Sequence, residues 1–149
     1  MTTIHLFTKI NAPIHTVFDL SRNIDIHQHS VAATKEIAIA GRTSGLIEHN
    51  ETVTFQGKHF GFSLKHKSRI TAMEVPSYFT DEMEEGTFKS FRHEHSFIEE
   101  NGFVLMTDKI QYETPFGILG KLFDALLLKK HLIDLIVIRN EILKELAEK

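Results

Sequence analysis

The chain has 149 residues, of which 42% are hydrophobic and 25% charged, and its net charge at pH 7 is −3. This composition is typical of one globular domain covering residues 1–149, with enough length to bury a core. No basic stripe is present, so nucleic acid is not an expected partner. There is no cysteine, which excludes disulfides, thiol nucleophiles and zinc–thiolate sites.

The most apolar run, 132–138, is seven residues long and contains Asp134. A membrane-spanning helix needs about 20 apolar residues, and the first ten residues lack the pattern of a signal peptide. We therefore expect a cytoplasmic protein with no stable membrane insertion. The ten histidines are the one unusual feature of the composition. Because histidine binds metals and titrates near neutral pH, they raise the question of a metal site.

The first part of the chain predicts a strand, two short helices and a second strand. Residues 2–10 alternate between apolar and polar, which predicts a strand. Pro13 suits the first turn of a helix that extends to about residue 22. Residues 25–30 predict a short helix or loop, and 33–41 predict a strand that ends at Gly41.

The rest of the chain predicts five more strands and a long helix. Two hairpin strands, 51–59 and 60–73, precede Pro76, and three further strands follow at 78–85, 87–99 and 103–114. Thr114 is a candidate N-cap for a helix from Pro115 to Lys149, although Gly117 and Gly120 can delay or break its start. This order predicts an α+β fold, with an antiparallel sheet packed on the helix.

The Asn101-Gly102 pair predicts a two-residue hairpin turn, and the turn sets the register of the flanking strands. In that register His95 lies opposite Asp108 and His93 lies opposite Ile110. A loop longer by two residues would instead place His93 opposite Asp108. A slip by one residue would bring Lys109 among the phenylalanines, so the hydrophobic pattern rejects it.

The inner face of the predicted sheet is apolar with an embedded polar set. Phenylalanine and aliphatic residues dominate it, and the polar members are His66, Ser68, His93, His95 and Asp108. In the strand at 78–85, the parity that buries Phe79 also carries Asp81 inward. Each buried polar group needs a partner. A cavity that holds solvent or a ligand therefore explains the polar set better than a close-packed core, and a self-satisfied core network is the competing interpretation.

Several segments resemble the SRPBCC superfamily over essentially the whole chain. They are API..VFDLSRNIDIHQ, AGRTSGLI, HFG at 59–61, HEHSF, MTDKIQYETPFGILG and the long C-terminal helix. The chain is most similar to a bacterial subgroup of stand-alone domains. The resemblance implies the helix-grip fold of START domains, Bet v 1 and polyketide cyclase-like proteins. In that fold a curved seven-stranded antiparallel sheet surrounds the C-terminal helix, and an apolar cavity lies between them. The superfamily shares no catalytic signature, so the resemblance bears on fold more than on activity.

Three functions remain open for the same residues. The first is binding of a small hydrophobic or amphipathic ligand, lipid-like, polyketide or aromatic, without a cofactor. The second is a cyclase or dehydratase that uses a His–Asp pair from His93, His95 and Asp108 as general base. The third is a metal site formed by those three residues. HEHSFIE also has the H-x-H-x3-E spacing of cupins, but cupins lack a long terminal helix and the second cupin motif is missing.

We expect the ligand site to combine aromatic and aliphatic walls with the polar set. One stripe of the helix, including Leu119 and Ile133, is expected to face the cavity, while Leu128, Leu132 and Leu135 fall on another stripe. That second stripe leaves open whether the protein is a monomer or a weak homodimer. His131 is expected at a surface or edge position. The predicted ligand-binding residues are Phe55, Phe62, His66, Ser68, Phe91, His93, His95, Phe97, Met106, Asp108, Ile110, Leu122, Phe123 and Leu126.

Overall fold

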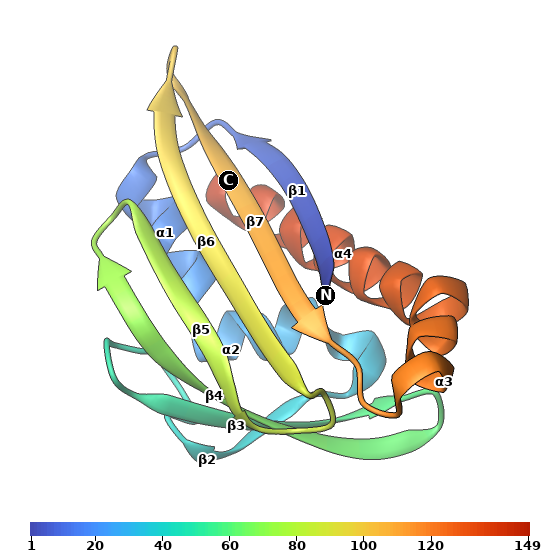
Figure 1. Ribbon diagram of the computed structural model, residues 1–149. Coiled ribbons are helices and arrows are strands. Elements are labelled where there is room, and N and C mark those ends of the chain that lie inside the picture. Colours follow the sequence, from blue (N-terminus) through green and yellow to red (C-terminus); the bar gives the residue numbers. More distant parts are fainter.

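All seven strands form a single antiparallel sheet in the computed structural model, which describes residues 1–149 (Figure 1). The spatial order is β1-β7-β6-β5-β4-β3-β2, so the first strand pairs with the last. The strands are β1 (Thr2–Ile10), β2 (Ile37–Gly41), β3 (Thr52–His59), β4 (Phe62–Glu74), β5 (Tyr78–Glu85), β6 (Ser90–Glu100) and β7 (Phe103–Glu113).

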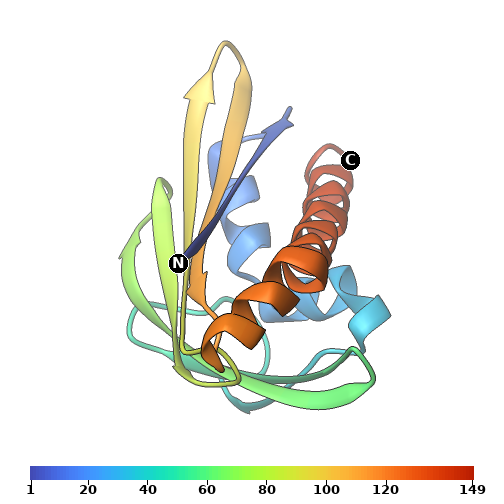
Figure 2. The same ribbon diagram turned by 45° about the vertical axis from the view of Figure 1, so that its right-hand side comes forward.

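The helices lie on the concave face of the curved sheet (Figure 2). They are α1 (Ile14–Arg22), α2 (Ile24–Ser30), the 3-10 turn η1 (Ala32–Thr34), α3 (Gly117–Phe123), the π-helical turn η2 (Asp124–Leu128) and α4 (Lys129–Ala147). The helix α4 contacts α1, α2 and β1. The predicted α+β helix-grip architecture and its order of elements are confirmed. None of the helices is both long and apolar enough to cross a membrane.

The predicted register of the β6–β7 hairpin is confirmed. His95 pairs with Asp108, His93 with Ile110 and Phe97 with Met106. Both residues of the turn, Asn101 and Gly102, have positive φ, as this type of two-residue turn requires. The turn therefore fixes which side chains of β6 and β7 share the inner face.

Two apolar clusters divide the space beneath the sheet. The larger one lies under α1, where the Phe18 ring packs edge-on against Phe79 and Phe97. The smaller one consists of Ile4, Ile110 and Tyr112, which pack directly against side chains of η2 and α4. The helix thus rests on β1 and β7, and it does not pack as closely on the strands at the other side of the sheet.

Several predicted boundaries are wrong. The strands β4 and β6 begin at Phe62 and Ser90 rather than at residues 60 and 87. The second strand begins at Ile37 rather than residue 33, because residues 32–34 form a 3-10 turn and Lys35 follows in the left-handed conformation. The C-terminal helix begins at Gly117 rather than Pro115, and Thr114 does not cap it. Phe116 precedes the helix with φ 68°, a left-handed conformation outside the range of right-handed helices.

The π-helical turn at 124–128 changes which side chains of the C-terminal helix face inward. A π turn inserts about one residue, so the side chains after it are displaced around the axis by about a quarter turn. Phe123 lines the cavity, and the next residue to line it is Leu128, five positions later, followed by His131 and Leu132. The stripe predicted for the start of the helix therefore does not continue along it.

Candidate functional site

A cavity of about 700 Å³ lies between the helices and the part of the sheet formed by β3 to β6. No residue of β1 or β7 lines it, because the helix packs directly against those strands. Apolar side chains form most of the wall: Ile24, Ile47, Val53, Phe55, Leu64, Ile70, Phe79, Phe88, Phe91, Leu119, Phe123, Leu128, Leu132, Leu135 and Ile136. The polar lining is concentrated at two places, one deep in the cavity and one near its opening.

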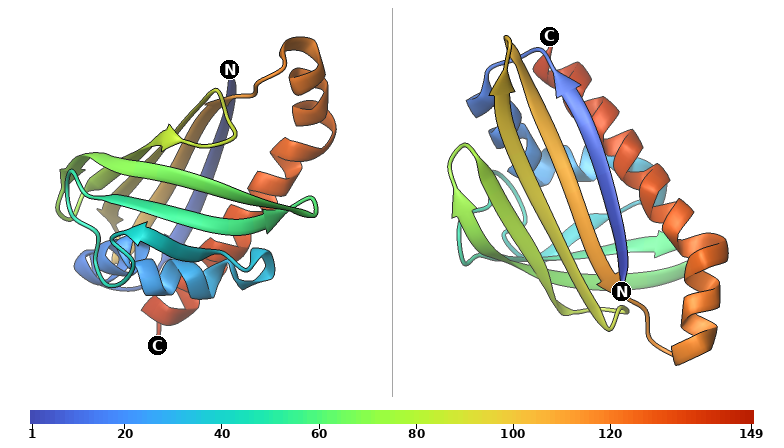
Figure 3. Two further views of the ribbon diagram at one scale, coloured as in Figure 1. Left: turned by 90° about the horizontal axis from the view of Figure 1, so that it is seen from below. Right: turned by 45° about the horizontal axis from the view of Figure 1, so that its top comes forward.

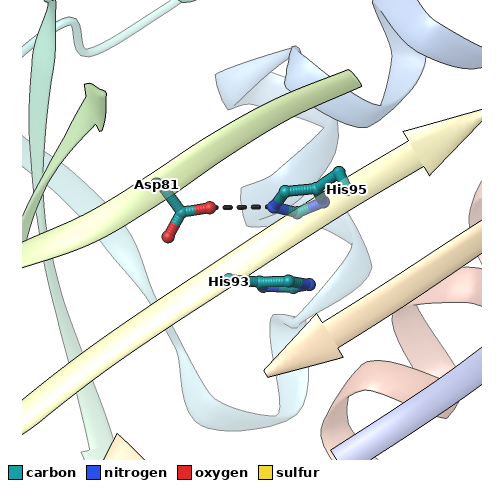
Figure 4. Close-up of side chains that lie close together, drawn as sticks. All are labelled: Asp81, His93 and His95. Carbon is teal, nitrogen blue, oxygen red and sulfur yellow. Dashed lines mark hydrogen bonds and ion pairs between the residues drawn. The ribbon is translucent and has the colours of Figure 1, made fainter. Parts of the chain in front are cut away.

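The deep polar group consists of two carboxylates, Asp81 and Asp108, and two stacked histidines, His93 and His95. Figure 4 shows the two histidines with Asp81. His93 Nε2 lies 2.7 Å from Asp108 Oδ1, and His95 Nε2 lies 2.8 Å from Asp81 Oδ2. The two imidazole rings stack with centroids 3.7 Å apart. Although His95 faces Asp108 across the strands, the short hydrogen bond of Asp108 goes to His93, its diagonal neighbour. His93, His95 and Asp81 line the cavity, while Asp108 lies behind them.

Asp108 is completely buried and is held by groups from two other elements, β6 and α4. Besides His93, it accepts hydrogen bonds from Arg139 Nη1 at 3.4 Å and from Asn140 Nδ2 at 2.8 Å, both on α4. Arg139 also donates to the backbone and side-chain oxygens of Ser21 on α1. Burial opposes the ionisation of Asp108, but the hydrogen bond and charge of His93 and the charge of Arg139 hold its pKa well below the usual range.

The protonation states of the other pair follow from their surroundings. Burial, together with the nearby His93, lowers the pKa of His95 to about 4. Burial opposes the ionisation of Asp81, yet the hydrogen bond from His95 and the charge of His93 lower the pKa of Asp81 to about 2. At neutral pH the neutral His95 therefore donates its Nε2 proton to the Asp81 carboxylate. Its buried Nδ1 atom has no hydrogen-bond partner and lies 3.6 Å from Asp108 Oδ1.

A second polar group lies near the opening of the cavity. Glu36 Oε1 is 3.3 Å from His27 Nε2, and His59 Nδ1 is 2.9 Å from His131 Nε2 on α4. His59 ends β3, so its contact with His131 joins the β3–β4 hairpin to the long helix. Burial and the neighbouring His59 lower the pKa of His131. His131 was predicted at a surface or edge position, and it lies half-buried at the opening, where it contacts His59 and Phe60 of the hairpin.

The cavity opens to solvent beside this second group. Phe62 and Phe116 both line the cavity, yet they are 69% and 85% exposed. Phe62 begins β4 and Phe116 immediately precedes α3. We call this opening, between the β3–β4 hairpin and α3, the mouth of the cavity.

Eight of the fourteen predicted ligand-binding residues line the cavity and six do not. Phe97 and Met106 belong to the close-packed core under α1, while Asp108 and Ile110 are on β7, which the helix covers. Leu122 and Leu126 point to solvent because the helix starts at Gly117 and changes phase at the π turn. The eight that line the cavity are Phe55, Phe62, His66, Ser68, Phe91, His93, His95 and Phe123.

The residues that could hold a metal differ from the predicted set. Ligand atoms of Asp81, His93 and His95 lie within 4.8 Å of one another. Asp108, the predicted carboxylate, instead contacts the Arg139 cation. A metal ion bound through both Nε2 atoms would have to displace the hydrogen bonds that the two histidines donate to their carboxylates.

The prediction from sequence missed three important polar residues of the site. Arg139 and Asn140 follow an apolar run of α4, and nothing in the local pattern indicated that they point inward. Glu36 was placed in a strand but lies beyond the 3-10 turn, where it reaches His27. The inward position of Asp81 was indicated by the sequence, because Asp81 lies two residues after the buried Phe79 on the same strand face.

Solved structures share this fold at low sequence identity. The protein TTHA0849 from Thermus thermophilus has a TM-score of 0.72 at 15% identity, over 95% of this chain and 97% of that one. Ginseng major latex-like protein 151 from Panax ginseng has a TM-score of 0.71 at 15% identity, over 99% of this chain and 98% of that one. A START superfamily protein from Mycobacterium smegmatis has a TM-score of 0.72 at 11% identity, over 98% of this chain and 97% of that one.

The protein has the helix-grip fold of START and Bet v 1-like proteins. The predicted SRPBCC resemblance is thereby confirmed at the level of the fold. No family model and no curated protein sequence matches the chain.

Proposed function

We propose that the protein binds one small hydrophobic or amphipathic molecule in the cavity between the sheet and α4. The observation that carries the proposal is the cavity itself, whose volume of about 700 Å³ lies in the range typical of ligand sites. Protein interiors are normally close-packed, with few voids larger than a water molecule. A mostly apolar space of this size therefore calls for an apolar occupant.

The deep polar group indicates which end of the ligand it contacts. Asp81 is ionised and uses only Oδ2 to accept the proton of His95, so Oδ1 is available to a ligand. Ser68 lines the same part of the cavity. A carboxylate accepts hydrogen bonds and repels anions. We therefore expect a lipid-like, polyketide or aromatic molecule whose buried end carries a hydroxyl group rather than a carboxylate.

Native mass spectrometry of protein purified from cell extract tests this proposal directly. We expect a retained molecule, seen as a mass added to that of the chain and released on denaturation. Ser68→Phe places a ring in the cavity and should abolish the added mass. Thr71→Phe, on the exposed face of the same strand, is the matched control and should keep it. An empty cavity in the wild type, with no thermal shift across lipids and polyphenols, would overturn the proposal.

A second candidate function is proton transfer to or from the bound molecule by His93. The observation that favours it is the 2.7 Å contact between His93 Nε2 and the ionised Asp108, which fixes the Nε2 proton and leaves Nδ1 as the available base. Such a base would suit the aldol cyclisation or dehydration of a poly-β-keto substrate. If a panel of these substrates shows no turnover above that of His93→Gln, this function is excluded.

A further inference from the structure

Half of the large hydrophobic side chains that the protein exposes are gathered at the mouth of the cavity. Nine of the eighteen come from two short segments, the tip of the β3–β4 hairpin and the helical segment 116–127. We call these nine the mouth patch. They are Phe60, Phe62, Phe116, Ile118, Leu119, Leu122, Phe123, Leu126 and Leu127.

The two segments form one continuous surface around the opening. The rings of Phe60 and Phe123 meet edge-on with centroids 5.2 Å apart, and the Phe60 ring also contacts His131. Figures 1 and 3 show α3 beyond the end of the sheet, beside the β3–β4 hairpin. Five members of the patch line the cavity, while Ile118, Leu122, Leu126 and Leu127 lie outside it.

The outward members have no packing role that explains them. Exposed apolar patches on soluble monomers are usually small, and a large one marks an interaction surface. A helical turn that exposes Leu122, Leu126 and Leu127 together is more apolar than contact with the hairpin requires. Something outside the described chain is therefore expected to cover this face.

The charges around the patch are positive. Segment 116–131 contains three lysines, all exposed, and its one acidic residue, Asp124, is buried against Tyr112 and Thr2. Of the lysines, Lys121 and Lys129 form no ion pair. On the hairpin side, Lys58 and Lys65 are also exposed and unpaired. This local surplus stands against a net charge of −3 for the whole chain.

We propose that the mouth patch docks on an anionic lipid bilayer. An exposed apolar helical face flanked by lysines is the pattern of segments that lie in a membrane interface. Each lysine near an anionic leaflet adds to the attraction. A second copy of the chain fits less well, because a two-fold contact places the same surface on both sides and would bring the lysines of one copy against those of the other.

Docking by the mouth patch would bring the cavity opening against the lipid. A hydrophobic molecule could then pass between bilayer and cavity without crossing water. This exchange step rests on the proposed function, whereas docking rests only on the surface described above. The two can therefore fail separately.

Co-sedimentation with sucrose-loaded vesicles tests the docking. The full chain, freed of any retained molecule, is mixed with vesicles of phosphatidylcholine alone or of equimolar phosphatidylcholine and phosphatidylglycerol. We expect binding to the mixed vesicles that weakens as salt is raised, and much weaker binding to phosphatidylcholine. Leu122→Glu/Leu126→Glu should lower the partition coefficient about tenfold or more, since two buried aliphatic side chains are lost.

The matched control makes the same change in charge and a similar change in exposed apolar surface, but at positions outside the mouth patch. Phe7→Glu/Ile98→Glu replaces two exposed hydrophobic residues on strands away from the mouth, so its net charge is the same as that of the test variant. Its binding should stay within about twofold of wild type. Circular dichroism and thermal unfolding confirm that both variants fold.

Three outcomes would overturn the proposal. The first is wild-type protein that stays in the supernatant with mixed vesicles, and the second is an equal loss of binding in the test variant and its control. The third is a stable dimer in light scattering that Leu122→Glu/Leu126→Glu abolishes, which would assign the face to a second copy. An empty cavity in native mass spectrometry together with vesicle binding would remove the exchange step and keep the docking.

Discussion

Arg139 of α4 and Asp108 of β7 form an ion pair inside the protein, with Nη1 3.4 Å from Oδ1 and side chains only 4% and 0% exposed. The same carboxylate oxygen accepts the short hydrogen bond from His93. One buried group therefore ties the long helix to the sheet and orients a histidine that lines the cavity. Stability and the geometry of the site depend on the same contact.

Removing the cation of this pair should destabilise the protein strongly. Arg139→Met keeps most of the side-chain volume but leaves the Asp108 charge buried without its compensating cation. We expect the free energy of unfolding to fall by about 3–5 kcal/mol, as measured by urea denaturation. Arg92→Met is the control, because Arg92 is 45% exposed in its ion pairs and its loss should cost less than about 1 kcal/mol. Equal losses in the two variants would contradict this account.

Acidification should destabilise the protein between pH 7 and 5 through His95. Its pKa of about 4 in the folded state lies below the ordinary value of 6.5, so in this window the unfolded chain binds the proton and the folded protein does not. Stability is therefore present above pH 6.5 and is lost as the pH falls toward 4, by about 2 kcal/mol at pH 5.

His95→Gln is the variant that isolates this effect. Glutamine can still donate to Asp81 but does not titrate, so urea unfolding of the variant should show a correspondingly smaller loss between pH 7 and 5. The pKa values of Asp81 and Asp108 are lowered, so their contributions are lost only below about pH 4. An unchanged pH dependence in His95→Gln would show that another group is responsible.

Substituting two neighbouring residues of the helix should affect ligand binding differently. Phe123 lines the cavity, whereas Leu122 faces solvent. Phe123→Ala should weaken the affinity for a dansyl-labelled fatty alcohol about tenfold in a fluorescence titration, because an apolar wall is lost. Leu122→Ala should leave that affinity unchanged. A loss in Leu122→Ala alone would mean that the helix faces the other way.

The hydroxyl of Tyr112 should hold the start of the C-terminal helix in place. It donates a hydrogen bond to Asp124 in the π turn, at 2.5 Å, and Thr2 on β1 donates to the other oxygen of that carboxylate. Tyr112→Phe should therefore speed amide hydrogen exchange in residues 117–128. Global stability should fall by only about 1–3 kcal/mol. Faster exchange spread evenly over the chain would argue against a local role.

Local chemistry predicted the sheet and the inner face of the site. The Asn101-Gly102 turn fixed the register, and in a strand a fixed register decides the face of every side chain. For that reason His93, His95 and Asp108 were placed together correctly from the sequence. Side chains alternate between the two faces of a strand, so the face of every residue is decided once the hairpin register is set.

The composition of the cavity wall was decided by tertiary structure. The helix packs against β1 and β7, so inward residues of those strands lie in the core, whereas most inward residues of β3 to β6 line the cavity. For this reason His93 lines the cavity and Ile110 does not. The phase of the helix depended on a π turn, which no hydrophobic pattern marks. A one-residue insertion there moves the inward position that follows Phe123 from Leu126 to Leu128.

The sequence by itself thus determined the order of the elements, the hairpin register and the inward direction of the polar residues on β6 and β7, because turns and strand alternation act over a few residues. Only the tertiary structure decided that Arg139 neutralises Asp108, that His131 meets His59, and that the mouth is lined with exposed apolar side chains. Those contacts join residues far apart in the chain, and they depend on how the C-terminal helix packs against the curved sheet.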